Sequence, residues 1–146
     1  MLITASNTWF AWAVLSACFA ALTAIFAKIG LDGIDSDFAT LVRTVVILVV
    51  LTGFVAYVGK WSNPAELSPR TVLFLVLSGL ATGASWVCYF RALKIGDASK
   101  VAPVDKLSVV LVAIFAVIFL GERPGARDWL GIGLVGAGVV VLALKR

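Results

Sequence analysis

The chain contains no histidine and only two cysteines, which narrows the chemistry that it can perform. Histidine is the commonest ligand in metal sites and the usual acid–base group near neutral pH. Cys18 and Cys88 both fall within apolar stretches, so we expect neither a disulfide framework nor a zinc site. We find no convergent nucleophile and base, and we therefore predict no metal, no cofactor and no enzymatic activity.

Charge is also scarce, since charged residues make up 14% and apolar residues 62% of the 146 residues. A water-soluble domain needs far more charge to cover its surface. The net charge of +4 comes from basic residues at the ends of apolar runs, not from a basic patch of the kind that binds nucleic acid. We therefore predict an integral membrane protein in contact with lipids, with almost no soluble part and no nucleic-acid partner.

Long uncharged runs divide the chain into segments of similar length. A bilayer core about 30 Å thick requires about 20 mostly apolar helical residues to cross it. The first run lacks the basic n-region of a signal peptide, so we expect it to be a retained helix. We predict an all-α, polytopic membrane protein with a single domain over residues 1–146. Its five transmembrane helices are predicted at 7–28, 37–58, 70–91, 99–120 and 126–144.

Small residues mark the faces where helices are expected to approach closely. Gly79 and Gly83 in the third predicted helix have G-x-x-x-G spacing, which puts both on one face. The last predicted helix is rich in glycine, and we expect Gly133 and Gly136 to lie at its packing surface. This spacing is common in glycine-rich spans, so it predicts tight packing without identifying the partner.

Arg43 places a charge inside the second predicted helix, about 9 Å from its start at the rise of an α-helix. Its long stem could carry the guanidinium back to the interface, or the charge could pair within the fold. Alternatively, Arg43 could line a cavity, because charges at membrane depth are costly and commonly functional. The sequence leaves these interpretations open.

The fourth predicted helix begins with Pro103 and an adjacent pair of charges, Asp105 and Lys106. Lys106 lies about 10 Å inside this helix by the helical rise, which makes the pair a second candidate for function. Adjacent residues of a helix point about 100° apart, so we expect the two side chains to face different surroundings. Glu122 at the far end is better explained as orienting the helix end.

Trp86 and Tyr89 lie near the end of the third predicted helix. One interpretation places them in the aromatic belt at the membrane interface. The other makes them aromatic walls of a substrate cavity, which typically combines apolar surface with a few polar groups.

Five spans place the two termini on opposite sides of the membrane. Eight of the 12 Lys and Arg residues fall on the C-terminal side, which favours an outer N-terminus and a cytoplasmic C-terminus. Arg43 and Lys106 enter from this side at similar depth. If the second and fourth helices are neighbours, they form a cationic vestibule near Asp105, suited to an anionic or zwitterionic solute. The eight are Lys28, Arg43, Arg91, Lys94, Lys100, Lys106, Lys145 and Arg146, against Lys60, Arg70, Arg123 and Arg127.

The second half of the chain carries a recognisable pattern. It reads Tyr89-Phe90-x-Ala92-Leu93-x-x-Gly96-x-Ala98-x-x-Val101-Ala102-Pro103, then a long apolar helix ending in Leu120-Gly121-Glu122, then a glycine-rich helix. This pattern resembles one repeat of the EamA family, part of the drug/metabolite transporter superfamily, in its short five-helix form. The resemblance covers nearly the whole chain.

The resemblance implies transport of a small metabolite or drug-like solute by alternating access. Larger members carry ten helices as two inverted repeats around a central cavity, so one repeat implies a homodimer in a bacterial or archaeal plasma membrane. The first four helices of each half line that cavity, which by resemblance would bring Trp86, Tyr89 and the start of the fourth helix to it. The substrate-binding candidates are Arg43, Trp86, Tyr89, Asp105 and Lys106.

Several properties stay open at this point. Small multidrug transporters, which are four-helix proteins with one chain inserted both ways, couple to protons through a carboxylate in the first helix, and the first helix here has none. A flippase-like half-unit for a lipid-linked headgroup is one alternative, and a non-transporting membrane subunit is another. The substrate, the direction, the coupling ion and the parallel or antiparallel arrangement of the dimer do not follow from the sequence.

Overall fold

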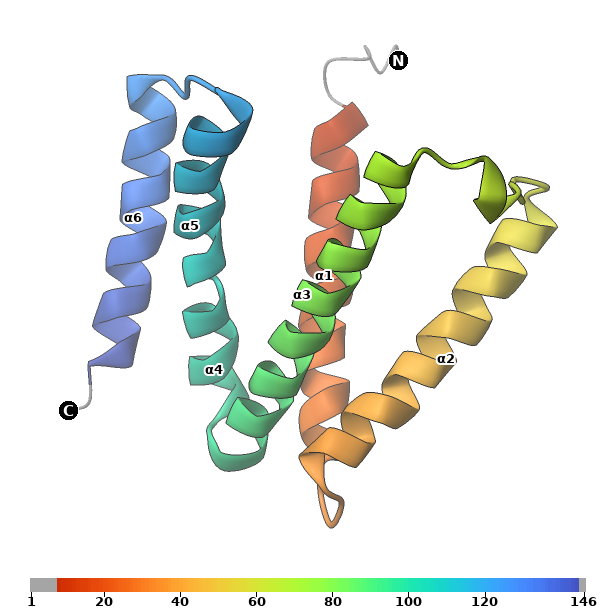
Figure 1. Cartoon of the computed structure of the whole chain (residues 1–146). Coiled ribbons are helices and arrows are strands. Elements are labelled where there is room, and N and C mark those ends of the chain that lie inside the picture. Colours follow the sequence, from red (N-terminus) through yellow and green to blue (C-terminus); the bar gives the residue numbers. More distant parts are fainter. Residues whose placement is uncertain (1–7, 145–146) are drawn as a thin grey trace, which may run out of the picture. The chain divides into compact units, whose positions relative to one another are not determined.

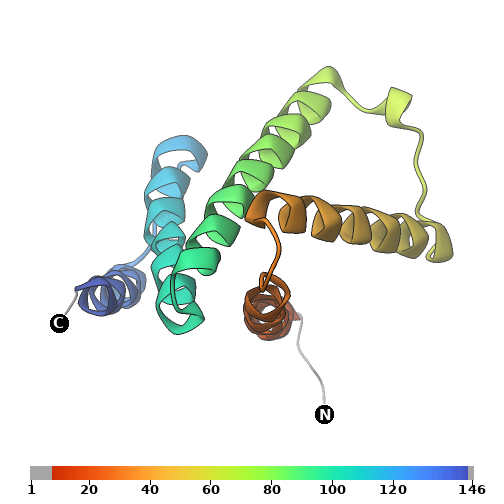
Figure 2. The same cartoon turned by 90° about the horizontal axis from the view of Figure 1, so that it is seen from below.

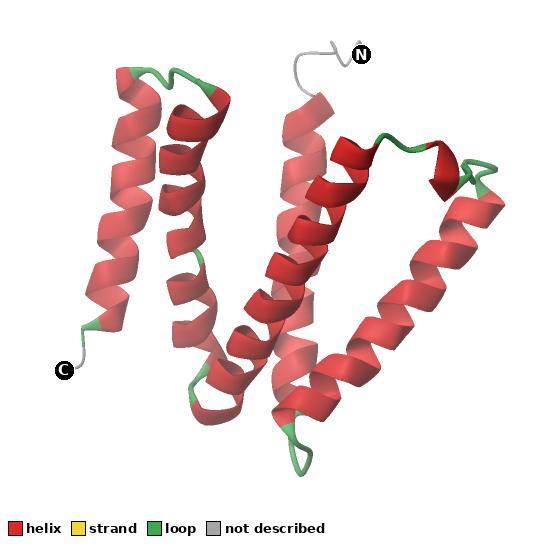
Figure 3. Ribbon diagram, in the orientation of Figure 1, coloured by secondary structure: helices red, strands yellow, loops and turns green. Residues whose placement is uncertain are grey.

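The computed structural model describes residues 8–144, and this part of the chain is helical (Figure 3). Within it, five helices are long and apolar enough to cross a membrane, which confirms the predicted all-α fold with five spans. Residue 7, at the start of the first predicted helix, lies outside the described residues, as do Lys145 and Arg146 of the charge count. The spans are Thr8–Gly30, Ser36–Tyr57, Pro69–Ile95, Ala98–Leu120 and Ala126–Ala143.

The first three spans are the continuous helices α1 (Thr8–Gly30), α2 (Ser36–Tyr57) and α3 (Pro69–Ile95). The carboxylate of Asp35 caps α2, because it accepts hydrogen bonds from the N–H groups of the next helix turn at 2.9 and 3.1 Å. A short 3-10 turn, η2 (Pro64–Glu66), precedes α3. α3 runs past its predicted end at residue 91, so the segment that was expected to be a loop supplies one more helical turn.

The fourth span is interrupted, unlike the single helix that the sequence predicts. It consists of α4 (Ala98–Asp105), α5 (Leu107–Phe115) and the π-helical turn η3 (Ala116–Leu120). Between α4 and α5, the N–H of Lys106 donates to the carbonyl oxygen of Pro103 at 2.9 Å, which is the tighter i→i−3 pattern. Figure 3 shows the interruption as a short loop-coloured segment.

This interruption corrects the expectation that Asp105 and Lys106 face different surroundings. Lys106 Nζ lies 3.3 Å from Asp105 Oδ2, so the two form an ion pair. The expectation assumed regular helix geometry at both positions. Lys106 instead follows the last residue of α4, and its flexible stem folds back onto the preceding carboxylate.

The described residues form two units, and each has its own small core. Residues 27–95 make up one unit, in which α2 and α3 are joined at one end and diverge away from it (Figures 1 and 2). Its buried side chains are at this junction, where Leu93 is completely buried and Phe90, Leu31 and Thr40 are nearly so. The junction lies between the end of α3 and the turn that connects α1 to α2.

Charged side chains hold this junction together by binding oxygens on the opposite segment. Lys28 Nζ donates to the carbonyl oxygen of Leu93 at 2.7 Å. Lys94 Nζ donates to the carbonyl oxygens of Leu31 at 2.6 Å and Ile34 at 2.8 Å. The Leu93 carbonyl lies in the last turn of α3, and those of Leu31 and Ile34 follow α1. Backbone oxygens at helix ends lack helical partners, so a cation there is favourable.

An arginine adds a side-chain pair at the same junction. Arg91 Nε and Nη2 donate to Asp37 Oδ1 at 2.9 Å and to Asp37 Oδ2 at 2.6 Å. Both side chains remain substantially exposed, so water and ions screen the pair. The bidentate geometry nonetheless specifies how the end of α3 meets the start of α2.

The remaining described residues form the second unit, in which α6 (Ala126–Ala143) packs antiparallel to α5 (Figure 1). Gly136 permits this approach, since a Cβ atom built there would lie 3.2 Å from Val110 Cγ2. A Cβ built at Gly133, Gly79 or Gly83 would meet nothing within 4 Å among the described residues. Packing of those three against a further helix stays a prediction. Gly121 ends η3 with φ of +67°, a conformation that glycine adopts without strain.

We expect the variant Lys94→Met to destabilise the protein, because it removes the cation that binds two carbonyl oxygens across the junction. The loss should be about 1.5 kcal/mol, at the low end for hydrogen bonds to a charged group because Lys94 is partly exposed. Thermal unfolding in an uncharged detergent would then show a melting temperature lower by about 3–5 °C.

The matched control is Lys100→Met. Among the described residues, Lys100 pairs with Asp97 alone, at 3.2 Å, and both side chains are 70% exposed, so its loss should leave the melting temperature unchanged. Equal melting temperatures for the two variants would show that the lysine contacts do not stabilise the junction.

Candidate functional site

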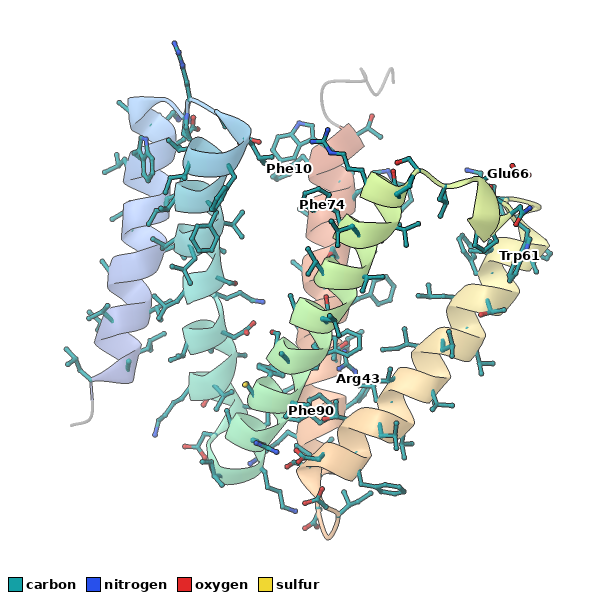
Figure 4. All side chains as sticks on the ribbon, in the orientation of Figure 1. Phe10, Arg43, Trp61, Glu66, Phe74 and Phe90 are labelled. Carbon is teal, nitrogen blue, oxygen red and sulfur yellow. The ribbon has the colours of Figure 1, made fainter. Side chains whose placement is uncertain are left out.

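Arg43 lies on the face of α2 that meets α3, one to two helical turns from the junction. Its Cζ atom is 4.1 Å from the ring centroid of Trp86 and 5.2 Å from that of Phe90. Figure 4 shows Arg43 pointing from α2 toward α3, with Phe90 beside it. Distances below about 6 Å mark cation–π contacts, so the guanidinium is held by two aromatic rings.

The depth of these contacts bears on the choice between snorkelling and an inward-facing role. Arg43 is about 10 Å from the start of α2, and Trp86 is about 13 Å from the end of α3, by the helical rise. The guanidinium lies closer to Trp86 than to Phe90, which is one turn nearer the helix end. The side chain is therefore not drawn back to the start of its helix, and the aromatic contacts keep the charge at the depth of Trp86.

The spacing of the aromatic residues places them on one surface of α3. Trp86, Tyr89 and Phe90 are separated by three and four residues, which brings side chains together on one helical face. The rings of Tyr89 and Phe90 have centroids 6.4 Å apart, and Phe90 is only 3% exposed. Phe90 was not among the predicted binding residues, although its four-residue separation from Trp86 is a signal that the sequence contains.

The predicted site residues fall into two groups. Arg43, Trp86 and Tyr89 belong to the unit of residues 27–95, whereas Asp105 and Lys106 belong to the other unit. Arg43 and Trp86 are in direct contact, and Asp105 and Lys106 pair with each other at the interruption between α4 and α5. The cationic vestibule that combines Arg43 with Lys106 stays a prediction, as does the binding role of all five residues.

The arrangement around Arg43 suits recognition rather than covalent chemistry. A guanidinium over an aromatic ring uses its flat face for that contact, while its N–H groups lie along its edge. Among the described residues there is no group of three or more His, Cys, Asp or Glu side chains that could hold a metal ion. The side chains near Arg43 are aromatic, so the cluster offers one positive charge within an apolar surface.

Comparison with known proteins finds similarity over most of the chain. The EamA-like transporter family matches residues 7–144. An uncharacterized transporter in the cobO 3' region of Sinorhizobium sp is 61% identical over 139 residues, covering 95% of this chain and 99% of the relative. No solved structure matches.

Two more distant relatives differ in how much of their length the chain spans. The uncharacterized transporter YxxF of Bacillus subtilis is 26% identical over 136 residues, which is 92% of this chain but 42% of the relative. A probable 4-amino-4-deoxy-L-arabinose-phosphoundecaprenol flippase subunit, ArnE of Yersinia pestis, is 26% identical over 84 residues, or 57% of this chain and 74% of the relative.

We expect the contact between Arg43 and Trp86 to be measurable as a coupling free energy. A double-mutant cycle with Arg43→Gln and Trp86→Leu should give about 0.5–2 kcal/mol by thermal or denaturant unfolding, because the pair is partly shielded from water. The parallel cycle with Arg70→Gln and Phe74→Leu should give a value near zero. Arg70 is exposed at the start of α3, with its Cζ 6.0 Å from the Phe74 ring. Equal coupling in both cycles would contradict a specific role for the Arg43 contact.

Proposed function

We propose, because this chain belongs to the EamA-like transporter family, that it moves a small metabolite or drug-like solute across the membrane by alternating access. Family membership makes the chain a multi-pass membrane transporter and not an enzyme. It also argues against the alternative of a membrane subunit that takes no part in transport.

The single EamA match, over residues 7–144, supports a homodimer as the working unit. The chain spans nearly all of the Sinorhizobium relative but 42% of the Bacillus relative, so a longer transporter of the family carries more than twice this length. Many transporters place their binding site between two repeats of opposite orientation. A chain with one repeat needs a second copy to supply the other half of such a pathway.

Within each copy, we assign the substrate pathway to the face that carries Arg43, Trp86 and Tyr89, with Asp105 and Lys106 contributing from the start of the fourth span. The position of Arg43 is the main support for this assignment. An ionisable group well inside a span is costly and commonly marks a transport pathway, and this one is held there by aromatic rings. The position of Asp105 and Lys106 within a span supports the second part, because ionisable residues inside spans commonly mark substrate pathways.

The proposed location is the plasma membrane of a bacterial or archaeal cell. The relatives named above come from bacteria, in agreement with this assignment. The charge distribution favours an outer N-terminus and a cytoplasmic C-terminus for a chain inserted in one orientation. The same distribution, without Arg43 and Lys106, leaves six basic residues against four, so insertion in both orientations is compatible with it.

A second candidate function is that of a flippase-like half-unit, which would move a lipid-linked headgroup. The partial similarity to the ArnE flippase subunit favours it. A guanidinium on the proposed pathway would attract the phosphate of such a lipid. The carrier and the flippase differ in whether the moved molecule is soluble or attached to lipid.

We expect two differently tagged copies of the chain to co-purify from the membrane, because one repeat provides half of a transport pathway. The control is a mixture of membranes that express each tag separately, which should give no co-purification. Failure of the co-expressed copies to co-purify would exclude the homodimer. Paired C-terminal reporters then give the orientation, since activity on both sides indicates antiparallel copies and cytoplasmic activity alone indicates parallel ones.

We expect Arg43→Gln to reduce transport about tenfold or more, since a lost hydrogen bond to a charged group is worth at least one power of ten in affinity. Cells that overproduce the protein would be compared with cells that overproduce the variant, by untargeted profiling of metabolites and lipids in cells and medium. Compounds whose distribution changes with the unaltered protein identify its cargo, and their solubility separates the carrier from the flippase.

The matched control in this experiment is Arg70→Gln, at the end of a span and away from the proposed pathway. It should transport like the unaltered protein at the same level of production. If overproduction of the unaltered protein changes the distribution of no compound, the proposal that this chain transports a solute by itself is wrong.

A further inference from the structure

Arg43 is the cation at the α2–α3 contact that lacks an oxygen partner within residues 27–95. Lys28, Arg91 and Lys94 each donate to a backbone carbonyl or a carboxylate at the junction. The contacts of Arg43 are the rings of Trp86 and Phe90. Within residues 27–95, the five N–H donors of this guanidinium therefore have no hydrogen-bond acceptor, in a segment that is apolar enough to span a membrane.

The acidic residues of this chain have other positions or other partners. Within residues 27–95, Asp37 is bound by Arg91, and Asp35 caps α2. Asp105, the acid placed well inside a span, is bound by Lys106. The remaining five of the eight acidic residues lie in loops or at helix starts: Asp32, Glu66, Asp97, Glu122 and Asp128.

The aromatic contacts leave part of the guanidinium able to bind. They occupy its flat face, whereas hydrogen bonds to an anion form in its plane, through two parallel N–H groups. An unpaired charge in an apolar setting is costly, and the cost falls when an oxyanion supplies both a counter-charge and two acceptors. Phe90, whose ring centroid lies 5.2 Å from Arg43 Cζ, is itself only 3% exposed.

We propose that Arg43, backed by Trp86 and Phe90, is the receptor for an oxyanion group of the transported molecule, a phosphate or a carboxylate. The inference rests on the proposed transport function and narrows its cargo to anions. The aromatic rings orient the planar fork of Arg43, and the cargo completes its hydrogen bonds. The oxyanion belongs either to a soluble metabolite or to a lipid headgroup, and both sources present the same chemistry to the guanidinium.

The test uses the purified full-length chain in dodecyl maltoside, an uncharged detergent without phosphate. Thermal unfolding is measured in sodium chloride, sodium phosphate and sodium acetate at equal ionic strength, and in micelles that contain phosphatidic acid. A ligand that binds only the folded protein raises its melting temperature, by about 5 °C at tenfold its dissociation constant for a chain of this size. We expect a saturating rise with at least one of the three oxyanions.

Matched variants separate specific binding from the general stabilisation that phosphate gives to proteins. Arg43→Gln should lose the rise, and Arg70→Gln should keep it. Arg43→Lys should keep part of it, because it retains the charge and loses the planar fork. Far-ultraviolet circular dichroism without added anion checks that each variant is folded. The unaltered protein, Arg43→Gln and Arg43→Lys are then also compared through the fluorescence emission of Trp86, in a chain whose other tryptophans are replaced by phenylalanine.

The outcomes decide both the inference and the source of the oxyanion. A rise that depends on Arg43 with phosphate or acetate assigns a soluble anion, and one seen with phosphatidic acid alone assigns a lipid headgroup. No rise with any oxyanion, or an equal rise in Arg43→Gln, overturns the inference. A neutral or cationic cargo in the profiling experiment would also overturn it while leaving the transport function intact, so the two failures are distinguishable.

Discussion

The junction between the end of α3 and the turn after α1 depends on lysines that donate hydrogen bonds to backbone oxygens where helices end. Lys28 and Lys94 each reach across to the opposite segment, and Leu93, whose carbonyl oxygen Lys28 binds, is itself completely buried. In a chain with so few charges, ordinary apolar contacts give little orientation, since lipid is as apolar as the side chains. Hydrogen bonds from lysine are directional, so they determine which turn of α3 meets the turn after α1. The contact of Arg43 with Trp86 and Phe90, one to two helical turns from the junction, depends on this arrangement.

Arg43 differs from those lysines in its position and in its contacts. They lie at helix ends, where carbonyl oxygens are available, whereas Arg43 lies inside α2, where the backbone oxygens are used by the helix itself. Its position over Trp86 and beside Phe90 is stabilised by the rings and not by an oxygen. Under the proposed function, a residue held this way keeps its hydrogen-bonding capacity for the transported molecule.

The interruption of the fourth span shows where sequence patterns mislead. Pro103 and the charged pair were correctly identified as unusual features, but an unbroken helix was assumed through them. The actual break at Lys106 lets adjacent side chains form an ion pair that helical geometry would have disfavoured. Whether a charged residue pairs with its neighbour depends on local backbone dihedrals, and these are set by contacts that a hydropathy pattern does not contain.

The sequence by itself determined the helical class, the five spans and the family, because the bilayer imposes a length and a composition on every segment that crosses it. It also singled out Arg43 and Trp86, since charges and aromatic residues inside a span are conspicuous. Only the tertiary structure showed that Arg43 contacts the Trp86 ring, that Phe90 closes the cluster, and that Lys28 and Lys94 bind across the junction. These contacts join residues that lie more than forty positions apart. Such pairings depend on how helices pack against one another, and local patterns of hydropathy and charge do not specify that packing.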